Sequence, residues 1–326
     1  MKEARDGEDG AVEAVVENDG EPKAAEPIST EPDGPVAAPA EEDLSSEVAD
    51  ALRRYAVPSL AVAGGLGLLE LLRARFQQGQ VFSPLPYPTG IWDPKSHGLD
   101  AEDVWFEAED GVRLHGWWIR YREARATVVY CHGNSGNLGD RVDIFRKLRR
   151  LRVHIFAFDY RGYGRSDGEP SEKGLFADVR AACDQVRDRL GVDPRTTLLF
   201  GHSLGGAVAI DGALHRPVAG LVVQSSFTDL DDMARHFYPK VPMHLITRNG
   251  FRSIDKVGRL TMPKLFLHGT DDPTVPFELG QRLHRAAAKP KEWFPVAGAG
   301  HNDIYKHGGL KYFRALSRFR ERCLRG

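Results

Sequence analysis

Short apolar runs alternate with helix-like stretches along most of this chain. The first two runs, 104–108 and 114–119, flank Asp110-Gly111, and an Asp-Gly pair between apolar runs is typical of a hairpin. Stretch 175–190 has apolar residues at helical spacing, and a last helix is expected from about Leu310. The remaining strand-like runs are 127–131, 153–158, 196–200, 220–223, 264–268 and 292–296. An opening hairpin followed by strand–helix units predicts an α/β fold: a mostly parallel central sheet with helices on both faces.

Polar residues that could take part in catalysis or binding follow five of these predicted strands directly. Because the carboxyl ends of parallel strands meet at one edge of a sheet, and ligands bind there, we expect these residues to share one rim. They are His132-Gly133-Asn134, residues 159–164, Ser203, Asp272 and His301.

The stretch Gly201-His202-Ser203-Leu204-Gly205-Gly206 matches the G-x-S-x-G pattern of a nucleophile elbow. An apolar strand-like run precedes it and the helix-compatible run 207–214 follows, which is the context that the pattern requires. The serine of such an elbow sits in a strained turn, where side chains two residues away on either side would collide. Glycine at 201 and 205 relieves that crowding, so we predict that Ser203 is a nucleophile.

A serine hydroxyl needs a base, an acid that orients the base, and donors for the oxyanion. His301, in a glycine-containing loop after the last predicted strand, is the candidate base. Asp271 and Asp272 are adjacent candidates for the acid, and only one of two consecutive side chains can face the histidine. We expect the backbone N–H groups of Leu204 and Asn134 to bind the oxyanion.

Residues 159–166, Asp-Tyr-Arg-Gly-Tyr-Gly-Arg-Ser, contain a G-x-G pattern without the third glycine or the P-loop spacing of a phosphate site. We therefore predict that they shape the rim of the pocket, with Arg161 tying loops together. The aromatic and apolar residues between 223 and 264 fit either a small cap that lines an acyl pocket or ordinary core packing. They are Phe227, Met233, Phe237, Tyr238, Pro242 and Phe251.

The net charge of −2 conceals two oppositely charged parts. Residues 1–50 hold 16 Asp and Glu against three Lys and Arg, a net charge of −13, and contain no aromatic residue. Such a segment cannot bury enough apolar surface to fold, so 1–50 is predicted to be a disordered acidic tail. Residues 51–326 have the remaining 41 basic and 30 acidic residues, a net charge of +11, and no nucleic-acid motif accompanies this charge.

Residues 51–76 are a hydrophobic segment and the candidate membrane anchor, with membrane contact expected through 55–72. The uncharged part, 55–69, is shorter than the roughly 20 apolar residues of a full span, and arginines flank both sides. A helix packed on the domain is the alternative, so both cytoplasmic and membrane-associated localisation stay open. Residues 77–326 form the predicted catalytic domain. The three cysteines form no C-x-x-C pair, which indicates neither a disulfide framework nor a zinc site, and Cys131 is expected to be a buried thiol.

These motifs together resemble the α/β-hydrolase superfamily, and within it the serine-aminopeptidase-like group that includes bud-emergence-type proteins and related protein depalmitoylases. The resemblance covers about residues 81–316. In that group the acid lies three residues after the glycine of a His-Gly pair, which is Asp272 here. The depalmitoylases carry an N-terminal cysteine cluster that this chain lacks. The matching pieces are Asp110-Gly111, 132–134, 159–164, 201–206, 268–272 and 300–303.

The resemblance implies the α/β-hydrolase fold and a serine hydrolase. We expect it to cleave carboxylic esters or thioesters of a small-molecule or acylated substrate, without cofactor or metal. A serine aminopeptidase-like peptidase is the second hypothesis and a membrane-tethered, non-catalytic interaction module the third. The basic stretch from Lys311 fits either an anionic membrane surface or a solvated helix face.

Overall fold

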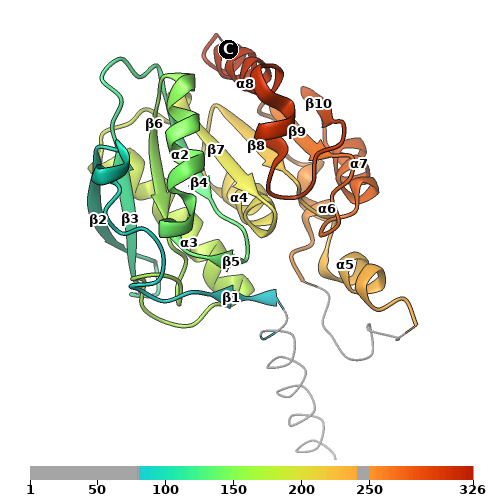
Figure 1. The fold of residues 1–326 in the computed structure, drawn as a ribbon, viewed down its shortest axis with the longest axis horizontal. Coiled ribbons are helices and arrows are strands. Elements are labelled where there is room, and N and C mark those ends of the chain that lie inside the picture. The colour runs from blue at the N-terminus through green and yellow to red at the C-terminus, as the bar shows by residue number, and fades with distance from the viewer. Residues whose placement is uncertain (1–78, 80, 241–249, 326) are drawn as a thin grey trace, which may run out of the picture. The chain divides into compact units, whose positions relative to one another are not determined.

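The computed structural model describes residues 79, 81–240 and 250–325. An eight-stranded sheet, in the order β10-β9-β8-β7-β4-β6-β3-β2, forms its centre (Figure 1). β3 (Arg113–Ile119) runs antiparallel to both of its neighbours, β2 (Ala101–Glu107) and β6 (Val153–Phe158), and the other neighbouring strands are parallel. The remaining strands are β4 (Ala126–Cys131), β7 (Thr197–His202), β8 (Gly220–Gln224), β9 (Lys264–Gly269) and β10 (Lys291–Val296).

The strands predicted from hydrophobic periodicity are the strands of this sheet, including the hairpin of β2 and β3. A second, two-stranded sheet escaped that prediction. It pairs β1 (Ser83–Pro84) with β5 (Ser135–Gly136) in parallel. Strands of two residues are too short to show a period in the sequence, so only the folded chain reveals them.

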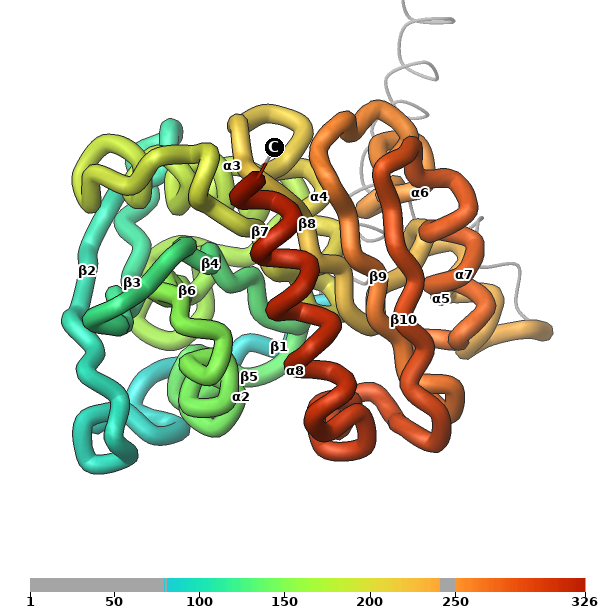
Figure 2. The backbone as a smooth tube through the Cα atoms, turned by 90° about the horizontal axis from the view of Figure 1, so that it is seen from above, coloured from blue at the N-terminus to red at the C-terminus, as the bar shows by residue number. Residues whose placement is uncertain are grey.

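Helices cover both faces of the large sheet, as predicted (Figure 2). α2 (Val142–Leu148) and α8 (Ile304–Cys323) pack on one face, and α3 (Glu172–Asp184), α4 (Leu204–His215), α6 (Ser253–Val257) and α7 (Phe277–Ala286) pack on the other. Successive side chains of β4 point to opposite faces of the sheet. Val128 and Tyr130 pack under α2 and α8, whereas Val129 and Cys131 pack on the other face, under α3 and α4. A strand that is buried on both faces needs apolar residues at every position, which explains the continuous apolar runs.

Two predicted helices differ in detail from the structure. The stretch 175–190 begins earlier, because the Ser171 side chain caps the first turn of α3, and after Asp184 it continues as a π-helical turn to Arg189. α8 begins at Ile304 rather than near Leu310. Gly309 breaks α8 with φ 47° and ψ −133°, so a short first helix precedes this glycine and the long helix predicted from about Leu310 follows it.

The segment between β8 and β9 contributes α5 (Leu230–Phe237) and α6, with 241–249 outside the described residues. Its aromatic residues divide between the core and the surface, and whether any of them lines an acyl pocket stays a prediction. Phe227 and Phe251 are buried in the core, whereas Phe237 and Tyr238 are 51% and 42% exposed. Pro242 lies outside the described residues.

The acidic tail 1–50 and the hydrophobic segment 51–76 also lie outside the described residues, so disorder, anchoring and the domain boundary at 77 stay predictions. Within 79, 81–240 and 250–325, no helix combines the length and the apolar character that a membrane crossing requires. Cys131, Cys183 and Cys323 are free and buried, which confirms the expectation for Cys131.

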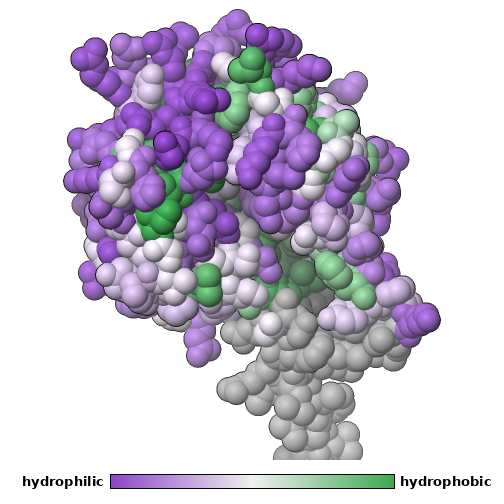
Figure 3. All heavy atoms as spheres, viewed as in Figure 1, coloured by the Kyte–Doolittle hydropathy of each residue, from purple (hydrophilic) through white to green (hydrophobic). Residues whose placement is uncertain are grey.

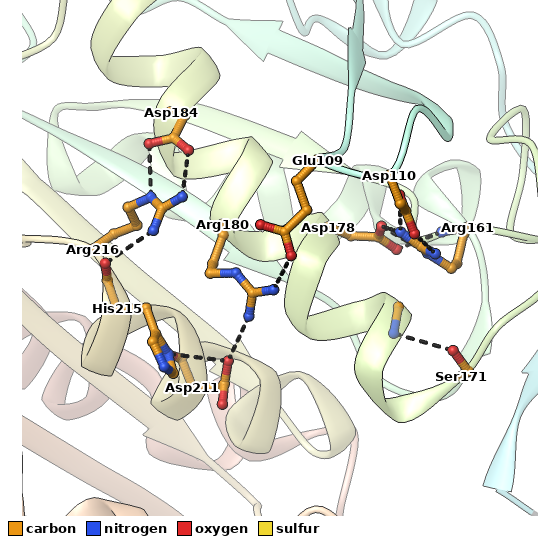
Figure 4. A network of polar contacts seen from close by, with 11 residues as sticks. Glu109, Asp110, Arg161, Ser171, Asp178, Arg180, Asp184, Asp211, His215 and Arg216 are labelled. Carbon is orange, nitrogen blue, oxygen red and sulfur yellow. Dashed lines mark hydrogen bonds and ion pairs between the residues drawn. The ribbon is translucent and has the colours of Figure 1, made fainter.

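Ion pairs tie the β2–β3 turn to the helices (Figure 4). The Arg161 guanidinium donates to both carboxylate oxygens of Asp110, at 2.7 and 3.0 Å, and to the fully buried Asp178 at 2.8 Å. Arg180 joins Glu109 of the same turn to Asp211 of α4. The prediction that Arg161 ties separate segments together is confirmed, and its bidentate geometry fixes the orientation of the turn as well as its distance.

Candidate active site

Ser203 occupies the turn between β7 and α4, at the carboxyl edge of the parallel strands. Its backbone has φ 56° and ψ −122°, a conformation that costs a residue with a side chain on the order of 1–3 kcal/mol. The Ser203 N–H donates to the Gln224 carbonyl at 2.9 Å, which ties the strained turn to β8. The elbow predicted from the sequence is therefore present, with its serine at the N-terminus of a 12-residue helix.

The two glycines of the motif are required by close backbone contacts. A Cβ on Gly201 would lie 2.2 Å from the Gly205 carbonyl oxygen. A Cβ on Gly205 would lie 2.0 Å from the Cys131 carbonyl oxygen and 2.4 Å from that of His132. These contacts support the explanation given for the glycines, and they show that the elbow is pressed against the end of β4.

We expect Gly205→Ala to lower the thermal midpoint of unfolding severely or to prevent folding, at a cost above about 4 kcal/mol, because the new methyl group meets backbone that cannot move away. Gly212→Ala, in the same helix, is the matched control. Its Cβ would lie 2.9 Å from a Val179 methyl carbon, and side chains shift more readily. Calorimetry of both variants checks the difference. Equal losses at the two positions would contradict the role assigned to the backbone contact.

His301 and Asp272 meet on loops that follow β10 and β9. The His301 ring donates from Nδ1 to Asp272 Oδ2 at 2.8 Å. The other oxygen, Oδ1, accepts the N–H groups of Thr274 and Val275 at 2.9 and 2.8 Å. Asp271, in contrast, is exposed and accepts a hydrogen bond from its neighbour Thr270. Of the two adjacent carboxylates, Asp272 is the one that contacts the histidine.

Burial by itself would raise the pKa of Asp272, but contacts from His268 and His301 outweigh it and hold that pKa well below its ordinary value. The carboxylate is therefore ionised at neutral pH. Since a carboxylate only accepts, His301 carries a proton on Nδ1, and the neutral ring keeps its lone pair on Nε2. That tautomer is the one a general base requires.

His202 connects the elbow to the histidine loop. Its Nε2 donates to the His301 carbonyl oxygen at 3.2 Å, and the two ring centroids lie 5.0 Å apart. Burial lowers the pKa of His202 to about 3, so this ring is neutral under ordinary conditions. Ser203, Asp272 and His301 are 7%, 8% and 9% exposed, so each of the three side chains is largely desolvated.

The loop after β4 lies beside Ser203, since a Cβ on Gly133 would be 3.5 Å from Ser203 Cβ. His132 Nδ1 donates to the Gly133 carbonyl oxygen at 2.7 Å. In a trans peptide the C=O and N–H point in opposite directions, so this bond also orients the Asn134 N–H. Leu204 is the first residue of α4, and an N–H group in the first turn of a helix has no partner within the helix.

The fold agrees with comparisons against known proteins. A family model described as serine aminopeptidase, S33, matches residues 122–250. The alpha/beta hydrolase domain-containing protein WAV2 of Arabidopsis thaliana is 32% identical over 288 residues, which cover 80% of this chain and 91% of WAV2. This chain belongs to the alpha/beta-hydrolase family. Protein Rv2307c of Mycobacterium tuberculosis, named as uncharacterized, is 39% identical over 67% of this chain and 79% of its own length.

Solved structures support the same fold for this alpha/beta hydrolase. The Pyrococcus furiosus esterase Pf2001 superposes with a TM-score of 0.62 at 22% identity, over 74% of this chain and 98% of the esterase. The alpha/beta hydrolase GrgF from Penicillium superposes with a TM-score of 0.58 at 18% identity, over 70% of this chain and all of GrgF. Family membership supports the function of a hydrolase, and therefore of an enzyme.

Four residues of this hydrolase's site carry contacts that the sequence did not assign. His202 was described above. His268 donates to the Val275 carbonyl oxygen at 2.9 Å and lies 3.4 Å from Asp272 Oδ2. The hydroxyl groups of Tyr160 and Tyr163 donate to the carbonyl oxygens of His132 and Asn134, at 3.0 and 2.7 Å. All four stand in motifs read from the sequence, but their partners come from other segments.

Through these two tyrosines, residues 159–164 hold the loop after β4, and that they shape the rim of a pocket stays a prediction. For metals, the described ranges contain no cluster of three or more His, Cys, Asp or Glu side chains suited to bind an ion.

Proposed function

We propose that this protein is a serine hydrolase that cleaves carboxylic esters or thioesters through an acyl-enzyme on Ser203. The observation that carries the proposal is the buried contact of 2.8 Å between His301 and an ionised Asp272, on a loop that packs against the strained Ser203 turn. The strained turn, the desolvated side chains and the fixed histidine tautomer are all features that favour nucleophilic catalysis by a serine.

In the proposed mechanism the Ser203 hydroxyl oxygen attacks the substrate carbonyl carbon while His301 Nε2 takes the hydroxyl proton. The N–H groups of Leu204 and Asn134 bind the oxyanion, and each such donor is typically worth about 10²–10³-fold in rate. His301 then gives its proton to the leaving alkoxide or thiolate. Water, deprotonated by the same ring, attacks the acyl-enzyme and releases the acid. Asp272 holds His301 in its productive tautomer throughout.

The partly buried Phe82 adjoins the loop after β4 and supports an acyl chain as the part of the substrate bound near Ser203, with the buried rings of Phe251 and Phe176 behind it. The Phe251 ring packs against Phe82 and Phe176, with centroids 6.1 and 5.5 Å apart. Phe82 lies between two residues whose backbones bind Asn134. The similarity to a protein named as an esterase, Pf2001, favours the same substrate class.

A peptidase that acts on N-terminal residues is the second candidate, because the matching family model is described as serine aminopeptidase. It would use the same serine, histidine and aspartate, with an amine as leaving group. Recognition of the substrate ammonium would require an unpaired carboxylate near the serine. The substrate class separates the two candidates, whereas the nucleophile does not.

A fluorophosphonate probe tests the proposal, because it reacts with serines that an adjacent base activates. We expect mass spectrometry to find the adduct on the peptide that contains Ser203 and to find none in Ser203→Ala. A panel of acyl esters, acyl thioesters and aminoacyl amides at matched concentrations then identifies the leaving group. Absence of labelling would refute the serine-hydrolase proposal and favour a non-catalytic module. Release from aminoacyl amides alone would favour the peptidase.

A further inference from the structure

Residues 81–85, which we call the strap, enter the fold between two loops at the edge of the sheet. β1 lies in the strap and pairs with β5 of the loop after β4, and the two short strands lie side by side (Figures 1 and 2). The Leu85 N–H donates to the Gly136 carbonyl oxygen at 3.3 Å. The Leu85 carbonyl oxygen accepts from the Asn137 side chain at 2.9 Å and from the Gly164 N–H at 3.1 Å.

The strap binds Asn134 at two points. The Asn134 side chain donates from Nδ2 to the Val81 carbonyl oxygen at 3.1 Å. The Ser83 N–H donates to the Asn134 carbonyl oxygen at 3.2 Å. The same oxygen accepts the hydroxyl of Tyr163 at 2.7 Å. Both the side chain and the carbonyl group of Asn134 are therefore fixed from outside its own loop.

These contacts matter because the N–H of Asn134 is the proposed oxyanion donor. The direction of a backbone N–H depends on the dihedral angles of its residue, and the carbonyl and side chain on either side of Cα determine those angles. A donor is effective only when it lies about 2.7–3.1 Å from the position of the oxyanion, and an error of about 1 Å can cost 10²-fold in rate. The His132 contact holds one side of the Gly133–Asn134 peptide plane, so loosening the Asn134 carbonyl on the other side would let that plane, and with it the N–H, tilt.

The strap also meets the cap. The Phe82 ring packs edge-on against Phe251, whose N–H donates to the Glu172 carboxylate at 2.6 Å. Phe251 has φ 48°, so this hydrogen bond holds a backbone conformation that a bulky residue rarely adopts. Most of the surface in Figure 3 is hydrophilic, and hydrophobic residues show in several places, one of them near β1 and α5. The strap thus joins the loop after β4 to the buried aromatic residues Phe251 and Phe176.

We propose that the strap positions the oxyanion donor, with Val81 and Ser83 as positioning residues that act through Asn134. The proposal rests on the proposed serine-hydrolase function. Neither residue is assigned a contact with the substrate, so the strap affects the stabilisation of the transition state more than the binding of the ground state. The strap is then a part of the active site that comes from outside the strand–helix units, more than 50 residues before the loop it holds.

Ser83→Pro in the full chain removes the N–H that binds the Asn134 carbonyl, and Ser83→Ala is the matched control that keeps it. The Ser83 side chain is exposed, so alanine removes no buried contact. With a p-nitrophenyl ester, and rates normalised to sites titrated with fluorophosphonate, we expect kcat of Ser83→Pro to fall about 10–100-fold with KM within about threefold. We expect a trifluoromethyl ketone, which forms a tetrahedral adduct with the serine, to lose affinity by a similar factor. Ser83→Ala keeps the N–H, so its kcat and ketone affinity should fall far less than those of Ser83→Pro.

Tyr163→Phe is a second variant that does not alter the strap backbone. It removes the other donor to the same carbonyl oxygen and keeps the ring that fills the core. We expect a smaller loss in kcat, and the double variant with Ser83→Pro should depart from additivity because the two donors share one acceptor. Hydrogen exchange in residues 132–137 should increase in both variants, whereas a purely global loss of stability would increase exchange throughout the domain.

If Ser83→Pro had the normalised kcat and the ketone affinity of the wild type, the proposed role of the strap would be wrong. The serine-hydrolase proposal would still stand as long as Ser203 is labelled. A fall confined to KM would overturn it as well, since it would indicate ground-state binding. A wild-type protein that is neither labelled nor active on any ester, thioester or amide would refute the proposed function itself, and the catalytic role of the strap with it.

Discussion

Ser203→Ala is expected to lower kcat for a p-nitrophenyl ester by on the order of 10⁴–10⁶-fold, to the residual level that binding and oxyanion donors sustain. The reason is that no acyl-enzyme can form without the Ser203 oxygen. Alanine keeps the backbone N–H that donates to Gln224, so the elbow should persist. Steady-state kinetics and circular dichroism check both expectations.

The matched control for Ser203→Ala is Ser226→Ala. Ser226 is a buried serine that follows β8, and its side chain lies next to Gly206 of α4, the helix that begins after Ser203. The two variants therefore remove the same atom from neighbouring sites. We expect kcat of Ser226→Ala to stay within about threefold of the wild type, because the hydroxyl is not assigned to the reaction. Comparable activity in the two variants would show that the ester is hydrolysed elsewhere on the protein.

Asp272→Asn is expected to lower kcat by on the order of 10⁴-fold with little change in KM. An asparagine can offer an N–H where the carboxylate oxygen accepts now. The His301 ring would then place its proton on Nε2, and it could no longer take the proton from Ser203. The negative charge that stabilises the protonated ring in the transition state would also be lost.

Asp271→Asn is the control for Asp272→Asn, since it makes the same chemical change one residue away. Asp271 is exposed and its carboxylate contacts Thr270, so we expect kcat within about threefold of the wild type. Kinetics of the two variants side by side decide which carboxylate serves His301. A larger loss in Asp271→Asn would require the loop to rearrange when substrate binds.

The order of short apolar runs and helix-like stretches predicted the architecture, because the strands of a doubly covered parallel sheet are apolar at nearly every position. β4 and β9 are buried throughout, and both were found as apolar runs. The G-x-S-x-G motif likewise predicted the elbow, because the contact that excludes a side chain at Gly201 is local, with Gly205, although Gly205 itself is required by the distant carbonyl oxygens of Cys131 and His132. Features set by near neighbours in the chain can be predicted from the sequence alone.

The choice between Asp271 and Asp272 needed more than local pattern. Consecutive side chains diverge, but which one faces His301 depends on a loop 29 residues further along the chain. Resemblance to a family indicated Asp272, and the tertiary structure shows the contact. His202, likewise, meets a carbonyl group 99 residues away.

The strap is a feature that no pattern in the sequence predicted. Its strand β1 has two residues, too few for a period, and its partners lie about 50 residues further along the chain. Hydrogen bonds between backbone groups leave almost no trace in residue type, because every residue except proline offers the same N–H and C=O. The pattern of residues was therefore enough to predict the sheet, the elbow and the residue types of the candidate site. The folded chain decided how Asp272, His301 and Asn134 are oriented, because contacts between distant segments set those orientations.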